Sequence, residues 1–261
     1  MNPRTGFYPN YIALKTLLYR EINRFMRIWS QTLLPPAITM ALYFLIFGKF
    51  IGSQINDIQH YAYIQYIVPG LVMMSIMTSA YANTASSFFL TKFNKSIEEM
   101  LVSPMSNLIT LLGFMLGGTI RGLLVGIIVL IISFLFTHVP MFHPIIVLMM
   151  AILASTVFSL GGFINAIYAK RFDDISFIPT FVLTPLTYLG GVFYSLNQLP
   201  HFWRTLSIFN PVFDIVDTFR YGLLGINDLN IYFGFGLVTG LFFILFLWAW
   251  LLLQRGTGIK V

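Results

Sequence analysis

Residues 109–137 read ITLLGFMLGGTIRGLLVGIIVLIISFLFT, an apolar stretch in which Arg121 is the one charged side chain. A helix needs about 20 apolar residues to cross the ~30 Å hydrocarbon core of a bilayer. This stretch exceeds that length and predicts a membrane-spanning helix. Comparable stretches occur along the chain, and we predict six spans, at 31–51, 63–90, 109–137, 142–169, 177–197 and 231–253.

The composition of the whole chain agrees with this reading. Of the 261 residues, 57% are hydrophobic and 9% are charged, whereas a soluble domain carries about 25% charged residues. The net charge of +6 comes from basic residues at the ends of apolar segments, so no nucleic-acid partner is expected. The chain has no cysteine, which excludes disulfides and thiol chemistry. We therefore expect an all-α, polytopic membrane protein.

The basic residues also predict how the chain is oriented in the membrane. Six spans place both termini on one side of the bilayer. If that side is the cytoplasm, the inner segments hold 11 of the 15 lysines and arginines, the outer segments hold 3, and Arg121 lies within a span. This bias follows the positive-inside rule. We expect a cytoplasmic segment over 1–30, a transmembrane domain over 31–253 and a cytoplasmic tail over 254–261.

Residues 11–29, before the first span, have the periodicity of an amphipathic helix. Such a basic helix is expected in the plane of the inner leaflet. It is either a simple anchor or an anchor that also contacts a cytosolic partner. The apolar face holds Leu14, Leu18, Ile22, Phe25 and Trp29, and the polar face holds Lys15, Arg20, Asn23, Arg24 and Arg27.

The loop after the second span predicts a short cytoplasmic helix over 96–103. Ser96 and Glu99 have the spacing of a capping box, and Pro104 ends the helix. Its middle is apolar, and a short helix of this kind often fits a groove in another protein. The alternative is a plain folded turn.

Two features of the third span concern packing and charge. Gly118, Gly122 and Gly126 are spaced by four residues, which predicts close approach of a second helix. Arg121 lies among them, and an ionisable residue at membrane depth is a candidate functional group. Its long side chain can equally extend to the headgroups or pair with a protein group.

Polar side chains suggest that the second and fifth spans occupy inner positions. Ser75, Ser79, Asn83 and Ser86 fall on one helical face, where they either bond a neighbouring helix or line a path. The fifth span contains Pro179 and Pro185, which predict a kinked helix. It also carries Thr184, Thr187 and Tyr188.

The stretch 198–230 is too polar to span the membrane and too apolar for a simple loop. It suits two helices, over 199–209 and 212–224, with Asn210 as N-cap and Pro211 at the first helical position. Neither helix is long enough to cross a bilayer, so we expect a re-entrant or interfacial pair. Asp217 and Arg220, three residues apart, are expected to pair.

We find no motif for catalysis or metal binding in the sequence. There is no H-E-x-x-H, and Gly48-Lys49 lacks the rest of a phosphate loop. The four histidines fall at the predicted outer ends of spans, where imidazole is ordinary. We expect that the chain is not an enzyme, holds no metal and does not hydrolyse ATP.

Taken together, these segments resemble the type-2 permeases of ATP-binding cassette exporters, and among them the inner-membrane permeases of Gram-negative bacteria. The resemblance covers nearly the whole chain. It is carried by residues Arg24–Trp29, Val68–Gly70, Ser96–Pro104, Phe172–Ser176, Pro185–Gly191, Asn210–Val212 and Arg220–Gly222.

The resemblance implies a role for each segment. Residues 11–29 would be a connecting helix that contacts a cytosolic ATPase through Arg24 and Arg27, and 96–103 would be the coupling helix that enters this ATPase. ATP and Mg would be bound by the ATPase, with no cofactor in this chain. Two copies in the bacterial inner membrane, surrounded by lipid, would form the pore. The coupling contacts would come from Ser96, Glu98, Glu99, Met100 and Leu101; the pathway lining from Tyr43, Ser75, Ser79, Asn83, Thr184, Thr187, Tyr188 and Phe193; and the external gate from Asn210, Pro211, Asp217 and Arg220.

The main alternative is an ion-coupled secondary transporter. Such proteins bury several ionisable groups near the midplane of the membrane. This sequence offers only Arg121 near the midplane, and no inverted repeat relates its halves. A membrane-embedded enzyme or a scaffold without transport activity has less support, because neither accounts for the two predicted cytoplasmic helices.

Overall fold

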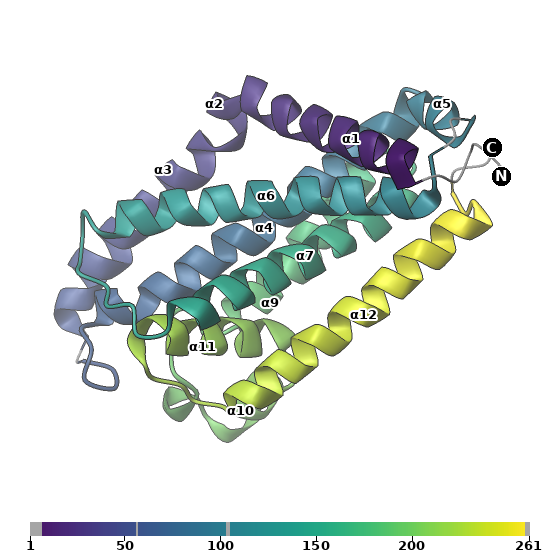
Figure 1. Cartoon of the computed structure of the whole chain (residues 1–261). Coiled ribbons are helices and arrows are strands. Elements are labelled where there is room, and N and C mark those ends of the chain that lie inside the picture. The colour runs from purple at the N-terminus through teal and green to yellow at the C-terminus, as the bar shows by residue number, and fades with distance from the viewer. Residues whose placement is uncertain (1–6, 56, 103–104, 259–261) are drawn as a thin grey trace.

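A computed structural model describes residues 7–55, 57–102 and 105–258, and Figure 1 shows that these residues form an elongated bundle of helices. Irregular helical segments over Phe44–Ile51 and Pro179–Leu183 are wider π-type turns. The α-helices are α1 (Phe7–Arg27), α2 (Trp29–Thr32), α3 (Leu34–Tyr43), α4 (Tyr63–Phe93), α5 (Ser96–Val102), α6 (Asn107–Ser133), α7 (Pro144–Tyr168), α8 (Phe172–Ile178), α9 (Thr184–Tyr188), α10 (His201–Ile208), α11 (Pro211–Leu224) and α12 (Ile231–Arg255).

Within the described residues, five helices are long and apolar enough to cross a membrane. They are Trp29–Ile51, which combines α2, α3 and the first π-type segment, together with α4, α6, α7 and α12. These agree with five of the predicted spans to within a few residues. The largest difference is in α6, which ends at Ser133, because the chain turns through Phe134–Phe136 before it reaches the predicted end at 137.

The predicted span at 177–197 takes a different form. Helical structure begins earlier, at Phe172, and passes through α8, the π-type segment and α9, ending at Tyr188. Pro179 and Pro185 lack the N–H groups that a regular helix requires, which explains the irregular turns. The predicted irregular helix is therefore present, but it ends at Tyr188 instead of continuing to 197. The count of six spans remains a prediction.

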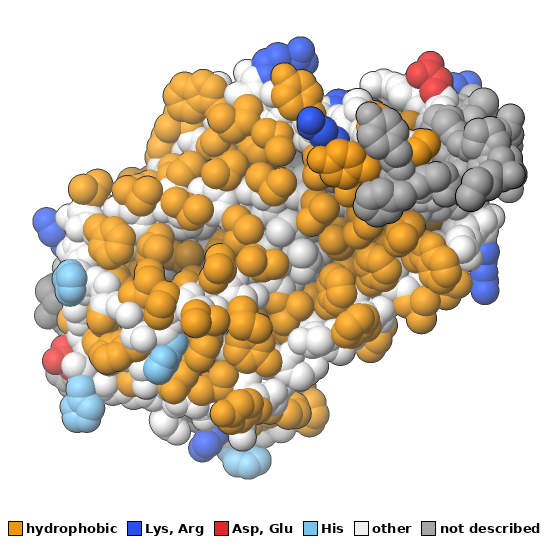
Figure 2. Space-filling view, in the orientation of Figure 1, with side chains coloured by type: hydrophobic (Ala, Val, Ile, Leu, Met, Phe, Trp, Pro, Cys, Tyr) orange, Lys and Arg blue, Asp and Glu red, His pale blue; other side chains and the backbone are white. Residues whose placement is uncertain are grey.

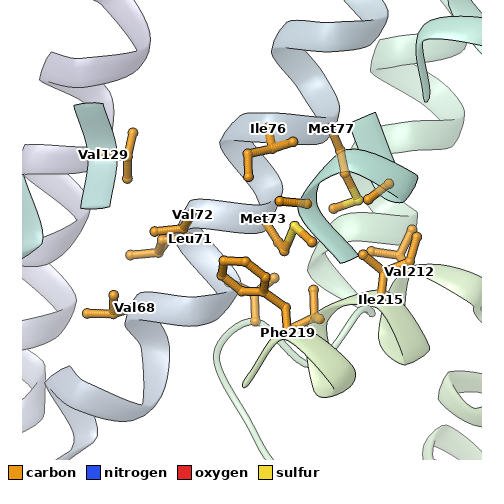
Figure 3. Packing of buried hydrophobic residues seen from close by; sticks show 14 of the residues in the cluster. Val68, Leu71, Val72, Met73, Ile76, Met77, Val129, Val212, Ile215 and Phe219 are labelled. Carbon is orange, nitrogen blue, oxygen red and sulfur yellow. The ribbon is translucent and has the colours of Figure 1, made fainter. Parts of the chain in front are cut away.

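Helix α4 is the centre of the bundle. Of its most apolar window, 78% is buried. Figure 3 shows Leu71, Met73 and Ile76 of α4 pointing into a cluster with Val129 of α6 and Phe219 of α11. A helix enclosed on several sides needs apolar residues around most of its surface, and α4 has them.

Glycines allow α6 and α7 to pack closely on α4, as the spacing in α6 predicts. A Cβ on Gly122 would lie 2.9 Å from the Cβ of Ala80, and a Cβ on Gly126 would lie 2.5 Å from Ile76. A Cβ on Gly162 of α7 would meet the backbone of Tyr81. These positions show that small residues serve helix contacts within the chain.

Apolar side chains also cover the outside of the bundle. Figure 2 shows hydrophobic side chains over most of the visible face, with few charged side chains among them. On α12, Phe243, Ile244 and Leu247 are more than half exposed. Water does not solvate such a surface well, whereas lipid chains do.

The two ends of the bundle differ. The start of α1, the helix α5 and the end of α12 lie together at one end, which we call the α5 end (Figure 1). At the opposite end, the α11 end, the backbone N–H of His143 donates to the Gly222 carbonyl at 2.8 Å and so joins the start of α7 to α11. Asn165, near the end of α7, bonds the Ile175 carbonyl of α8 at 3.1 Å, and Asn210 bonds the Leu186 carbonyl of α9 at 2.7 Å. The segment 172–188 therefore runs from the α5 end to the α11 end.

Candidate functional site

Helix α5 is the predicted coupling helix, and the structure places it at one end of the bundle beside α1 (Figure 1). It begins at Ser96 and ends at Val102, while the rest of the predicted segment, Ser103 and Pro104, lies outside the described residues. The side chains of Glu98 and Leu101 also lie outside the description. The capping hydrogen bonds between Ser96 and Glu99 remain a prediction.

The attachment of α5 to the bundle is apolar. Ile97 is 3% exposed and packs in a cluster with Leu17 of α1 and Phe88 of α4. Lys95 enters α5 with a φ of 59°, a backbone conformation that residues with a Cβ rarely adopt, and so turns the chain sharply between α4 and α5. Glu99 is exposed. Helix α5 is thus fixed to α1 and α4 on one face and open on another.

Helix α1 packs along α6 rather than lying apart from the spans. The Cβ positions of Gly113 and Gly117 in α6 would meet the side chains of Leu17 and Glu21 in α1. Both pairs are four residues apart on both helices, so α1 and the first half of α6 run side by side in the same direction. The amphipathic pattern is confirmed, but its apolar face is partly covered by protein, whereas the sequence predicts contact with lipid.

A buried polar cluster, formed by Glu21, Arg24, Asn83, Ser87 and Arg121, joins α1, α4 and α6. We call it the α1 cluster. Arg24 Nη2 donates to Asn83 Oδ1 at 2.7 Å and to the Asn83 carbonyl at 3.2 Å. Arg121 donates to Asn83 Oδ1 at 3.5 Å and to the carbonyl of Thr32 at 3.1 Å. Asn83 therefore faces two arginines, and Arg121 has the protein partners that its structural interpretation predicts.

Glu21 is the one charged member of the cluster that the sequence analysis missed. Its side chain is 0% exposed, accepts a hydrogen bond from Ser87 Oγ at 2.7 Å, and lies 3.3 Å from Arg24 and 3.5 Å from Arg20. A sequence signal for it exists, because Glu21 lies four residues after the buried Leu17 and four before the buried Phe25. A carboxylate on the buried stripe of a helix needs a partner.

The predicted pathway residues fall into two groups. Ser75, Ser79, Asn83 and Thr187 are buried within the chain. Ser75 bonds the carbonyl of Val72 in its own helix, and Thr187 bonds the carbonyl of Thr184. In this conformation a substrate does not reach these buried groups.

The second group is an aromatic cluster on the surface, formed by Tyr43, Phe47, Tyr188 and Phe193. The hydroxyls of Tyr43 and Tyr188 are 3.1 Å apart, and the rings of Phe47 and Phe193 have centroids 4.9 Å apart. The structure thus brings together three predicted pathway residues, Tyr43, Tyr188 and Phe193, from segments far apart in the sequence. Thr184 is exposed one turn before Tyr188.

The predicted gate residues hold α11 in place. Asn210 caps α11 through a 3.0 Å bond from the Val212 N–H to its side chain, and Pro211 occupies the first turn, as predicted. The predicted local pair is also present, because Arg220 Nη1 lies 3.5 Å from Asp217 Oδ1.

Arg220 makes further contacts that the sequence analysis did not predict. It is 1% exposed, its Nη2 donates to the carbonyl of Gly191, and its guanidinium lies 4.1 Å from the centroid of the Tyr66 ring. A buried cation of this kind is stabilised by the aromatic face and the carboxylate together. These contacts join α11 to α4 and to the turn after α9.

Asp228 is a second residue that the sequence analysis missed. It accepts hydrogen bonds from Gln59 at 2.7 Å, from Ser195 Oγ at 2.8 Å and from the N–H of Leu196 at 3.0 Å. Its own N–H donates to Asp217 at 3.0 Å. Three loops at the α11 end therefore meet at one carboxylate.

We expect Asp228→Ala to lower the free energy of unfolding by about 2 kcal/mol, because several donors lose a charged acceptor. The thermal midpoint of the detergent-solubilised protein measures this. Asp57→Ala, at an exposed acid on the loop before α4, is the control and should leave the midpoint unchanged. Equal midpoints for both variants would contradict the role given to Asp228.

Within the described residues, no group of three or more His, Asp or Glu side chains lies close enough together to hold a metal ion. The charged groups of the site are instead arginines and carboxylates that pair with one another at the two ends of the bundle. The described residues therefore present two polar clusters, the α1 cluster and the group around Asp217, Arg220 and Asp228. They also present one short helix, α5, with an exposed face.

Comparison with known proteins identifies the family. The sequence profile of the family described as ABC-2 type transporter matches residues 12–224. The inner membrane transport permease YadH of Escherichia coli (strain K12) is 52% identical over 250 residues, which cover 96% of this chain and 98% of that protein. Nodulation protein J of Rhizobium leguminosarum bv. viciae is 22% identical over 215 residues, 82% of this chain and 83% of that protein. The chain therefore belongs to the ABC-2 type transporter family, as a multi-pass inner-membrane permease subunit of an ATP-binding cassette transporter.

Proposed function

We propose that the chain is the membrane subunit of an exporter that moves a hydrophobic, lipid-like or glycan substrate outward. ATP and Mg²⁺ would bind to a separate cytosolic ATPase. The observation that carries this proposal is the arrangement of α5, which is anchored through Ile97 but leaves Glu99 exposed at the α5 end. A short helix of this kind offers a partner protein a rigid contact.

The proposal places the α5 end in the cytoplasm. The start of α1, α5 and the end of α12 share this end (Figure 1). The segment 172–188 runs between the two ends, so it supplies a sixth pass of the chain although its helix is irregular. An even number of passes is what termini on one side require.

A second copy of the chain would complete the transport pathway. The first span supports this, because only 11% of its most apolar window is buried within the chain. The aromatic cluster lies between this span and α9, where a second copy would face it. Helices α10 and α11 would close the pathway at its outer side. The buried Arg220 would hold α11 in position.

Movement of the ATPase would reach the pathway through α5. This helix contacts α4 through Ile97, and Met100 lines a shared cavity with Leu17 of α1. A displacement of α5 therefore acts on α1 and α4, two of the three helices that build the α1 cluster. Packed helices respond by shifting between two discrete arrangements.

We expect Glu99→Ala to lower ATP-driven transport at least about tenfold while the thermal midpoint changes little, because Glu99 is exposed and its one predicted fold contact is the capping bond of the short helix α5. Transport into membrane vesicles and ATP turnover are measured on the same preparation. Asp57→Ala removes an exposed acid at the opposite end and is the matched control. Normal transport by Glu99→Ala would show that the ATPase docks elsewhere.

Purification from the native membrane tests the proposal as a whole. An ATP-binding subunit should accompany the chain at about equal stoichiometry, and the Glu99→Ala variant should retain less of it. Transport that follows a proton gradient and ignores ATP would instead establish an ion-coupled secondary transporter.

A further inference from the structure

A cavity of about 520 Å³ lies between the second half of α1 and the last turns of α4. We call it the arginine pocket. Arg20, Arg24 and Arg27 line it from α1. Thr91 and Asn94 line it from the end of α4 and its C-terminal cap, and Ser96 lines it from the start of α5. The volume is in the range of small-molecule sites, about 300–1,000 Å³.

The pocket carries an excess of positive charge. The carboxylate near its three arginines is Glu21, which is 0% exposed and already pairs with Arg20 and Arg24. Among the described residues no carboxylate pairs with Arg27, which is exposed. Arg121 adds a further cation behind Asn83. An anion entering the pocket would meet guanidinium groups, whose charge-assisted hydrogen bonds bind phosphate oxygens strongly.

An apolar side chain also forms part of the pocket wall. Leu90 of α4 lines the pocket and is 38% exposed. An inorganic anion has no apolar group that could pack against Leu90. A protruding acidic side chain of a partner protein would fill only a fraction of the cavity. A molecule with a phosphate and an apolar part uses both features.

We propose that the arginine pocket binds the phosphate group of an amphiphile whose apolar part lies against Leu90. The arginines supply charge-assisted hydrogen bonds to the phosphate, and the Asn94 side chain supplies a neutral one. The pocket is built by α1, the end of α4 and Ser96 at the start of α5, so binding requires neither ATP nor a direction of transport. The inference therefore stands apart from the exporter proposal.

Binding to the full chain, purified with any subunits that accompany it, tests the inference. The probes are dihexanoyl phosphatidic acid, dihexanoylglycerol and inorganic phosphate. The variant is the double Arg20→Gln/Arg27→Gln, because Arg24 is needed for the α1 cluster. Lys15→Gln is the matched control, since Lys15 is an exposed cation of α1 outside the pocket.

Phosphatidic acid should bind the wild type and Lys15→Gln alike, and the double variant at least about tenfold more weakly. Dihexanoylglycerol should bind at least about tenfold more weakly than phosphatidic acid to the wild type. If the double variant has a lowered thermal midpoint, the single Arg27→Gln carries the test, because Arg27 is exposed and pairs with no carboxylate among the described residues.

Four results would overturn the inference. Inorganic phosphate that binds as tightly as phosphatidic acid would show that the pocket holds a free anion. Equal binding of dihexanoylglycerol would show that only the apolar part of the pocket wall matters. An equal loss in Lys15→Gln would show a general effect of surface charge. Loss of an ATPase subunit from the double variant with unchanged binding of phosphatidic acid would show that the pocket docks a protein.

Discussion

Replacing Glu21 with alanine is expected to lower the free energy of unfolding by about 3–5 kcal/mol, one of the two largest effects that we predict for a single side chain. Glu21 is 0% exposed and lies 3.3 Å from Arg24, whose own side chain is 24% exposed. Removing one partner of a buried ion pair leaves the other charge without compensation. Ser87 also loses its acceptor at 2.7 Å. The thermal midpoint of the detergent-solubilised protein measures the loss.

Two further variants separate charge from shape at this position. Glu21→Gln keeps the size of the side chain and an acceptor for Ser87 but removes the charge, so its loss should lie between those of wild type and alanine. Glu99→Ala removes an exposed carboxylate of α5 and should change the midpoint little. If Glu21→Ala were as stable as Glu99→Ala, the ion pair would not be what holds α1 to α4 and α6.

The second large effect is expected for Gly162→Ala. The new Cβ would meet the carbonyl oxygen of Tyr81 and would lie 3.2 Å from the N of Ala85, and both are backbone atoms of α4. Backbone in the middle of a packed helix cannot rotate away, so α4 and α7 must separate. Overpacking of this kind costs about 1–3 kcal/mol or more.

The neighbouring glycine provides a control in the same helix. A Cβ on Gly161 would lie 3.7 Å from ring carbons of Tyr81, which is ordinary contact. Alanine is also favoured over glycine in a helix by up to about 1 kcal/mol. Gly161→Ala should therefore equal or exceed the wild type in thermal midpoint while Gly162→Ala falls well below it. Equal losses for the two variants would show that α4 and α7 are not in close contact.

The spans illustrate how much of the fold could be predicted from the sequence. A continuous apolar run is a local property, and five of the six predicted spans appear as helices of membrane-spanning length. The exception is 177–197, where Pro179 and Pro185 break the helix. The prolines predicted an irregular helix, but its start at Phe172 depends on Asp174. That carboxylate accepts hydrogen bonds from the backbone N–H groups of Lys170 and Arg171 at 2.7 and 2.9 Å, which caps the start of α8.

The candidate site was predicted best where its residues act on their own helix. Asn210, Pro211 and the Asp217–Arg220 pair have the local geometry that their spacing predicts. Their partners elsewhere in the chain, such as Tyr66 and Gly191, were not predictable, because no periodicity reports which helix will lie alongside. The same limit applies to Asp228, which joins loops distant in sequence.

The sequence by itself determined that the chain is helical and built for lipid, that α1 is amphipathic and basic, and that a short helix follows α4. Hydropathy and helical period decide these features, and both are local. Only the tertiary structure decided that Asn83 faces Arg24, 59 residues away, and that Glu21 is buried against Ser87, 66 residues away. Only the tertiary structure brought Tyr43 to Tyr188, 145 residues away. Contacts of this kind depend on how close the helices pack, which Gly117, Gly122 and Gly162 permit, and close packing is a property of pairs of helices rather than of either sequence alone.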